Sequence, residues 1–167
     1  MTEITSASGS VQLTVHGKRM VAESMYAKGK AFLGAAILLR QKGGYEYVVL
    51  HLLCQGIEIV LKGLLLAVDY DKYKPKLKRF GHDLLKITDA ATDAAGLSAL
   101  RPSIRTEMES LNRLYSGHLL RYGSGYDILV DPRTIPSRQV LRRMAALLRL
   151  VERQGLIRVD AMCPSPA

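Results

Sequence analysis

The apolar positions between Gly44 and Val68 recur at alternating gaps of three and four residues, which is the period of an α-helix. Apolar residues also fill most of the remaining circumference, and a helix that is apolar nearly all round is usually buried. The pattern predicts a central core helix over residues 44–68, whose main face is formed by Tyr47, Leu50, Cys54, Ile57, Leu61 and Leu64.

One narrow polar stripe interrupts this helix, formed by His51, Gln55, Glu58 and Lys62. Polar groups in a buried helix need hydrogen-bonding partners. Glu58 and Lys62 are one turn apart and can pair directly. The remaining partners are expected at the start of the third helix and at the end of the fourth. The sequence therefore predicts a structural polar network of Glu58, Lys62, His82, Asp83, Arg121 and Tyr122.

Other periodic segments predict helices on either side of the central one. The expected stop and start signals are the glycine pair Gly43–Gly44, Asp83 as an N-cap, Pro102 in a first turn and Ser137 as a second N-cap. The additional helices are expected over about 18–40, 83–95, 97 or 102 to 122, and 137–154. The fold class that follows is all-α, an up-and-down bundle of four to five helices.

The length and composition place the chain as one domain. The expected organisation is a flexible N-terminal arm over 1–16, a single helical bundle over 17–155 and a flexible C-terminal tail over 156–167. Cys54 and Cys163 lie far apart, which indicates neither a disulfide framework nor a metal set. The N-terminus lacks the apolar run of a signal peptide, and Glu58 and Lys62 argue against a membrane span. We expect a soluble, cytoplasmic protein.

The formal net charge is +9 and the pI is about 9.7, which favours a polyanionic partner such as nucleic acid. Two segments concentrate the cations. The stretch 72–80 interleaves cations with two aromatic residues, and Pro75 predicts a loop there; the last helix carries an arginine face. Each is either solvated surface or a phosphate-contacting element. The candidate RNA-binding residues are Lys72, Lys74, Lys76, Lys78, Arg79, Arg142, Arg149 and Arg153.

No phosphate-binding glycine loop, dinucleotide fingerprint, zinc spacing or nucleophile elbow occurs in the sequence. The four histidines have no spacing that indicates metal ligation. Neither a metal nor a cofactor is therefore expected.

Three segments together resemble the HEPN domain family: QGIEIVLKGLLL at 55–66, GHDLLKI at 81–87 and LNRLYSGHLLRYG at 111–123. The resemblance spans roughly residues 20–150 in the family's order. It implies a HEPN-like helical bundle that forms a homodimer and is associated with RNA or nucleotides. It also implies an antitoxin or a nucleotidyltransferase-like protein as a possible partner. No membrane association is expected, because Glu58 and Lys62 interrupt the most apolar stretch.

Active members of that family are metal-independent ribonucleases with an Arg-x4–6-His motif, and Arg113 to His118 satisfies this spacing. Leu114 departs from the pattern, because the residue after the arginine is commonly polar. Histidine can transfer a proton near neutral pH, and arginine can stabilise the charge on phosphate. Five residues along a regular helix turn the two side chains about 140° apart. Joint catalysis therefore requires a helix distortion at Gly117 or assembly across a dimer.

The function expected from these observations is binding of RNA or nucleotides through basic surfaces. The first alternative is a toxin-type ribonuclease that uses Arg113 and His118. The second alternative is a non-catalytic protein-interaction module whose basic surface is incidental.

Overall fold

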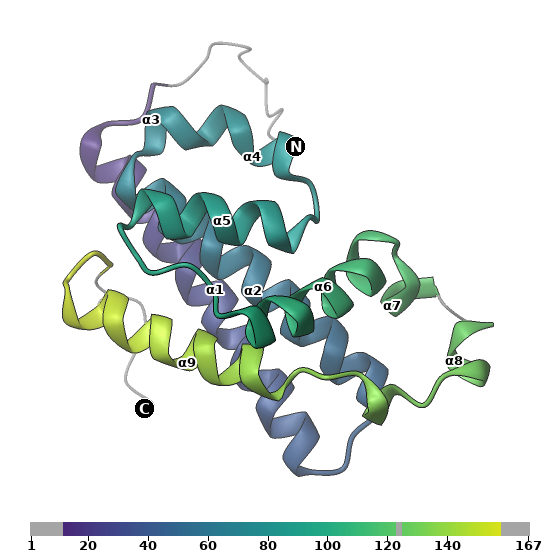
Figure 1. Cartoon of the computed structure of the whole chain (residues 1–167). Coiled ribbons are helices and arrows are strands. Elements are labelled where there is room, and N and C mark those ends of the chain that lie inside the picture. The colour runs from purple at the N-terminus through teal and green to yellow at the C-terminus, as the bar shows by residue number, and fades with distance from the viewer. Residues whose placement is uncertain (1–11, 123–124, 158–167) are drawn as a thin grey trace, which may run out of the picture.

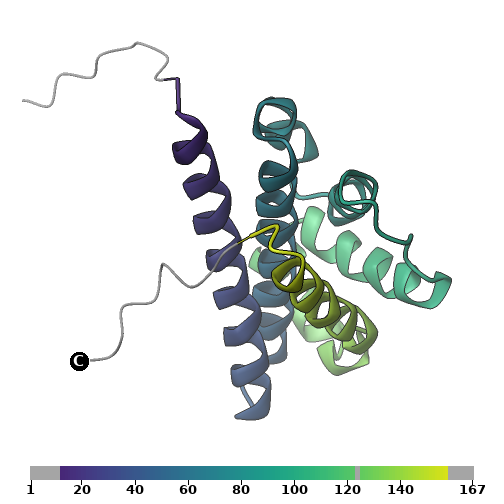
Figure 2. The ribbon, with the colours of Figure 1, turned by 90° about the vertical axis from the view of Figure 1, so that its left-hand side faces the viewer.

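A computed structural model describes residues 12–122 and 125–157, and these residues form helices and no strand. The all-α prediction is confirmed. The helices α1 (Val15–Gln41) and α2 (Glu46–Val68) run antiparallel, joined by a turn in which Gly43 has a φ of +70°. Figure 2 shows α2 between α1 on one side and α5 and α6 on the other. The predicted central helix is therefore the core of the bundle.

The contact between α1 and α2 is exceptionally close because glycines replace side chains along it. A Cβ atom added to Gly29 would lie 2.6 Å from the backbone nitrogen of Val60, and one added to Gly63 would lie 2.8 Å from that of Tyr26. Real Cβ atoms do not approach backbone so closely. These two glycines allow the two backbones to meet, a role that the sequence pattern did not indicate.

The lysine-rich stretch, expected to be a loop, is helical almost throughout. It forms α3 (Tyr70–Tyr73), the 3-10 helix η1 (Lys74–Lys76) and α4 (Leu77–Phe80). Pro75 did not prevent this, because it lies in the first turn of the 3-10 helix, where a missing backbone N–H costs little. The lysine segment, residues 72–79, therefore consists of short consecutive helices (Figure 1).

The third helix, α5 (Leu84–Ala94), begins at Asp83, whose side chain accepts a hydrogen bond from the backbone of Lys86. The predicted N-cap at Asp83 is confirmed. The fourth helix is shorter than expected: α6 (Pro102–Ser116) ends before Gly117, and α7 (Leu119–Tyr122) adds one further turn. Between them His118 has a φ of +58°, a left-handed conformation that is uncommon for a residue with a side chain.

The last part of the described chain comprises α8 (Tyr126–Leu129), the 3-10 helix η2 (Pro132–Thr134) and α9 (Arg138–Arg153). Ser137 occupies the N-cap position of α9, but its side chain does not cap the helix. Instead, Oε2 of the buried Glu107 on α6 accepts from the backbone nitrogens of Gln139 and Val140 at 2.8 and 3.0 Å. The Ser137 hydroxyl accepts from Arg40.

The ends of the bundle differ from the predicted domain limits. Helix α1 begins at Val15, within the predicted arm, and Ile157, in the predicted tail, is only 2% exposed. The rest of the predicted arm and tail, residues 1–11 and 158–167, lies outside the described residues.

Helix α2 is long and apolar enough to cross a membrane, but most of it is buried inside the bundle, as in a core helix.

Candidate functional site

Glu58 on α2 is 5% exposed, and its carboxylate accepts hydrogen bonds from three side chains. Lys62 Nζ lies 2.6 Å from Oε1, while His82 Nδ1 and Tyr115 Oη lie 2.9 and 2.6 Å from Oε2. Burial by itself would raise the pKa of Glu58, but hydrogen bonds from His82, Lys62 and Tyr115 outweigh it and lower the pKa. Glu58 is therefore ionised at neutral pH.

An ionised carboxylate only accepts hydrogen bonds, so Nδ1 of His82 must carry a hydrogen. The opposite ring nitrogen, Nε2, is then left for another partner, and the His82 side chain is 37% exposed. A buried carboxylate that fixes the tautomer and orientation of a partly exposed imidazole is a common arrangement where histidine binds or transfers protons.

The turn that carries His82 is fixed from two directions. Lys62 Nζ also donates to the backbone oxygen of Gly81 at 2.8 Å. On the other side, Asn112 Oδ1 accepts from the backbone nitrogen of Leu84 at 2.7 Å.

Asp83 caps α5 and pairs with Lys86. Burial raises the pKa of Asp83, but its hydrogen bonds with Lys86 lower it further than burial raises it. Asp83 thus holds the turn and does not touch Glu58.

Two further histidine rings, those of His118 and His51, lie near His82 and Tyr115. The ring of His118 lies edge-on to that of His82, with centroids 5.6 Å apart, and Tyr115 packs against His82 at 5.5 Å. The ring of His51 lies 5.9 Å from that of Tyr115, and its Nδ1 is buried without a hydrogen-bonding partner among the described residues. Burial, Arg121 and His82 lower the pKa of His51, so this ring is neutral at pH 7.

Arg121 and Tyr122, both predicted to join the network, are placed differently. Arg121 lies at its rim, with Nη2 3.5 Å from Oε1 of Gln55, and its charge acts on His51 and Tyr115. Tyr122 is 78% exposed, and within the described part of the chain its side chain forms no hydrogen bond. It therefore lies outside the network, because the short α7 turns its side chain to solvent. We call Glu58, His82, His118 and Arg121 the histidine site.

The structure does not bring Arg113 and His118 together within one subunit. The helix distortion that their cooperation requires is present at Gly117–His118. Arg113, however, lines a shallow pocket with Ser110, Leu114 and Ile135, whereas His118 lies on His82.

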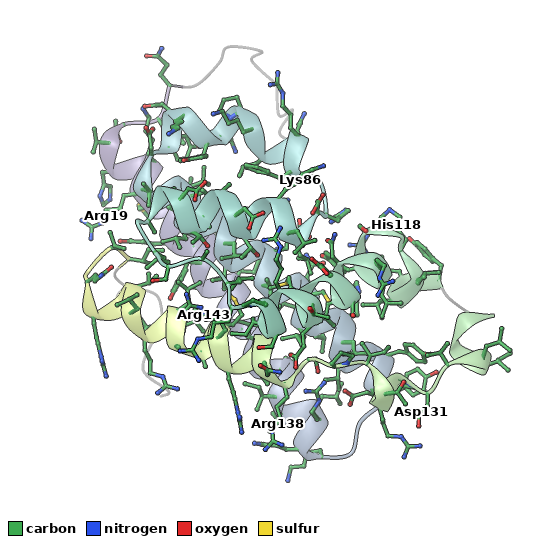
Figure 3. The ribbon with its side chains drawn as sticks, in the orientation of Figure 1. Arg19, Lys86, His118, Asp131, Arg138 and Arg143 are labelled. Atoms are coloured by element: carbon green, nitrogen blue, oxygen red, sulfur yellow. The ribbon has the colours of Figure 1, made fainter. Side chains whose placement is uncertain are left out.

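The lysine segment leads directly into the histidine site, because α4 ends at Phe80 and His82 follows two residues later. Within the segment, Lys74 lies over the ring of Tyr70, and Lys72 and Lys76 lie over that of Tyr73. The arginines of α9 lie elsewhere. Figure 3 shows His118 at the junction of α6 and α7, well away from Arg138 and Arg143 on α9.

Sequence reasoning missed two residues that organise the site. Tyr115 stands at an apolar position of α6, and its hydroxyl gave no signal of its own although it bonds to Glu58. Asn112 is an ordinary polar residue in sequence, but it holds the start of α5. Burial and the bond to Glu58 together raise the pKa of Tyr115, so its hydroxyl remains a donor at neutral pH.

Among the described residues, no group of three or more His, Cys, Asp or Glu side chains is arranged to hold a metal ion. The site's available chemistry is that of imidazole and guanidinium: proton transfer and binding of an anion. No protein-family model, curated protein or solved structure matches this chain.

Proposed function

We propose that this protein binds RNA or a nucleotide, with a phosphate group at the histidine site and the neighbouring backbone along the lysine segment. The observation that carries the proposal is the position of His82: a buried carboxylate orients it, and His118 lies beside it at the surface. Arg121 lies at the rim of the same network, where its guanidinium group contacts Gln55. Such donors, together with a line of cations, suit a phosphodiester chain.

The convergence of distant segments supports a HEPN-like arrangement as part of this proposal. The three segments that resemble the HEPN family contribute Glu58 and Lys62, then His82, then Tyr115, His118 and Arg121. Lys62, His82 and Tyr115 thus meet around the Glu58 carboxylate, although Glu58 and Tyr115 lie about sixty positions apart in sequence. His118 packs on His82, and Arg121 contacts Gln55. A homodimer belongs to the same proposal and is tested by measuring the mass of the protein in solution.

Fluorescence anisotropy with a labelled single-stranded RNA tests the binding proposal. We expect Arg121→Ala, and separately the neutralisation of Lys78 and Arg79, to weaken binding and to reduce its dependence on salt. Lys42→Ala is the matched control, because Lys42 is an exposed cation at the far end of α1. Binding that is unaffected by the first two variants would contradict the proposal.

A second candidate, a metal-independent ribonuclease, is favoured by the two adjacent histidines. In this reaction one neutral histidine would take the proton of a ribose 2′-hydroxyl, whose oxygen would then attack phosphorus. The other, protonated, would give its proton to the departing 5′-oxygen, leaving a 2′,3′-cyclic phosphate. Arg121 would stabilise the charge that develops on the phosphate oxygens.

Cleavage of RNA in the presence of EDTA distinguishes these candidates. A ribonuclease should lose its activity in His118→Ala and in His82→Ala. Arg113→Ala separates two versions of the hypothesis: activity should persist if Arg121 serves the site, and should disappear if Arg113 acts across a dimer. Intact RNA with wild-type protein would remove the ribonuclease and leave binding alone. If the protein also fails to bind RNA in the anisotropy experiment, the remaining hypothesis is a non-catalytic protein-interaction module.

A further inference from the structure

The arginines of α9 have no acidic partner among residues 12–122 and 125–157. Within residues 138–153 the sole carboxylate belongs to Glu152, which pairs with Lys30 of α1. Arg143 donates to the backbone oxygen of Ser98 and Arg149 to that of Ala145. Across the described residues, none of the helix's arginines forms an ion pair, in contrast to Lys18, Arg40 and Arg105 elsewhere. Within the described part of the chain, this helix therefore presents a positive surface without paired carboxylates.

Three of these arginines border a groove with an apolar floor. The groove has a volume of about 310 Å³ and lies between α9 and the connection that follows α5. Its floor is aliphatic, and Leu150 is 37% exposed there. The lining residues are Leu97, Ala146, Leu147 and Leu150 with Arg143, Arg149 and Arg153 around them. We call this the α9 groove.

The composition of the α9 groove matches an acidic, amphipathic protein segment better than it matches RNA. Sequence-tolerant RNA binding relies on aromatic side chains on which bases stack, and the groove has no aromatic lining. An amphipathic helix, in contrast, offers apolar side chains for an aliphatic floor and carboxylates at helical spacing for the surrounding guanidinium groups. Arginine binds carboxylates with paired hydrogen bonds, which also sets the orientation of the bound segment.

We propose that the α9 groove is a docking site for an acidic amphipathic segment of a partner protein. The carboxylates of that segment contact Arg143, Arg149 and Arg153, and its apolar side chains contact Leu150 and the rest of the floor. The groove is remote from the histidine site (Figure 3), so this inference does not rest on the proposed RNA binding.

The probe is a fluorescent peptide with Glu and Leu placed at helical spacing, titrated with the whole protein. We expect Arg149→Glu with Arg153→Glu to weaken binding at least about tenfold, because two attractive contacts become repulsive. Leu150→Ser should also weaken binding, by a few-fold. The matched control is Arg138→Glu, which changes the same charge on the same helix outside the groove and should alter the affinity by less than about twofold. Circular dichroism verifies that each variant is folded.

Two further measurements distinguish this groove from a general cationic surface. A peptide in which Ser replaces every Leu should bind much more weakly than the original peptide, and single-stranded RNA should not displace the original peptide. Equal affinity for the two peptides, or equal effects of Arg138→Glu and the double variant, would overturn the proposal. Displacement by RNA that is lost in the double variant would instead assign α9 to nucleic acid.

Discussion

Two buried glutamates, Glu58 and Glu107, are placed in opposite ways although their burial is nearly equal, at 5% and 7% exposed. Glu107 accepts from two backbone nitrogens at the start of α9 and joins α6 to that helix. Glu58 accepts from three side chains, one of which, His82, reaches the surface. The first carboxylate satisfies the backbone groups of a helix end. The second sets the orientation of groups that can meet a ligand.

The difference shows that burial of a charge does not by itself indicate function. What distinguishes Glu58 is that its side-chain partners are titratable and that one of them, His82, reaches solvent beside a second histidine. Removing Glu107 should therefore affect only stability. Removing Glu58 should affect both stability and the histidine site, and the following predictions separate these effects.

The largest expected effect is that of Glu58→Ala. It leaves the buried ammonium group of Lys62 without its counter-charge, and breaking a buried pair from one side typically costs about 3–5 kcal/mol. Urea denaturation measures the loss. Changing Lys62 to Met in the same protein should recover part of it, because no unpaired charge then remains. A double variant that is no more stable than Glu58→Ala would contradict this account of the pair.

Glu107→Ala should have the next largest effect, a loss of about 2 kcal/mol, because two backbone donors lose a charged acceptor. Its RNA affinity should remain that of the wild type wherever the variant is folded. Ser137→Ala is the matched control at the sequence-predicted cap, and it should cost less, because its hydroxyl does not cap α9. A larger loss in Ser137→Ala than in Glu107→Ala would show that the cap has been misassigned.

A smaller effect is expected from acidification. The pKa values of His51 and Glu58 both lie below their ordinary values, so the unfolded chain binds more protons as the pH falls. The contribution of His51 should be lost from about pH 6.5 downward. That of ionised Glu58 is present above its ordinary value of about 4.3 and is lost as the pH falls through its depressed folded value.

Urea midpoints between about pH 7 and about pH 2 measure this loss, and both groups predict a fall in the same direction. In His51→Gln the part of the fall that begins near pH 6.5 should disappear, while the part due to Glu58 remains. A midpoint that rises on acidification would contradict the placement of both groups.

The sequence was most informative where a pattern follows from one helix alone. The apolar period of α2 identified the core, and its polar stripe identified Glu58 and Lys62 as residues that need partners. What it could not give depends on contacts between helices. In sequence, Tyr115 is one more residue of an apolar helix face, and Glu107 resembles a surface carboxylate. Gly29 would only weaken a helix, and its role becomes clear when α2 is placed against α1.

The helix break at Gly117 explains why the motif from Arg113 to His118 could not be interpreted from spacing. A continuous helix would set the angle between the two side chains, but the left-handed conformation at His118 directs that residue to His82. Arg121, one turn later, lies at the rim of the polar network, where its guanidinium group contacts Gln55. The position of His118 thus depends on the backbone conformation of a single residue, which the spacing of the motif does not predict.

The most direct test of the histidine site is an NMR titration of the wild-type protein with a short single-stranded RNA, observing the imidazole ring signals. The ring signals of His82 and His118 should shift in proportion to the RNA bound. This experiment needs no variant, so loss of folding cannot imitate the result. If RNA binds while the signals of His82 and His118 stay unchanged, the site does not bind phosphate and the account of Glu58 is wrong.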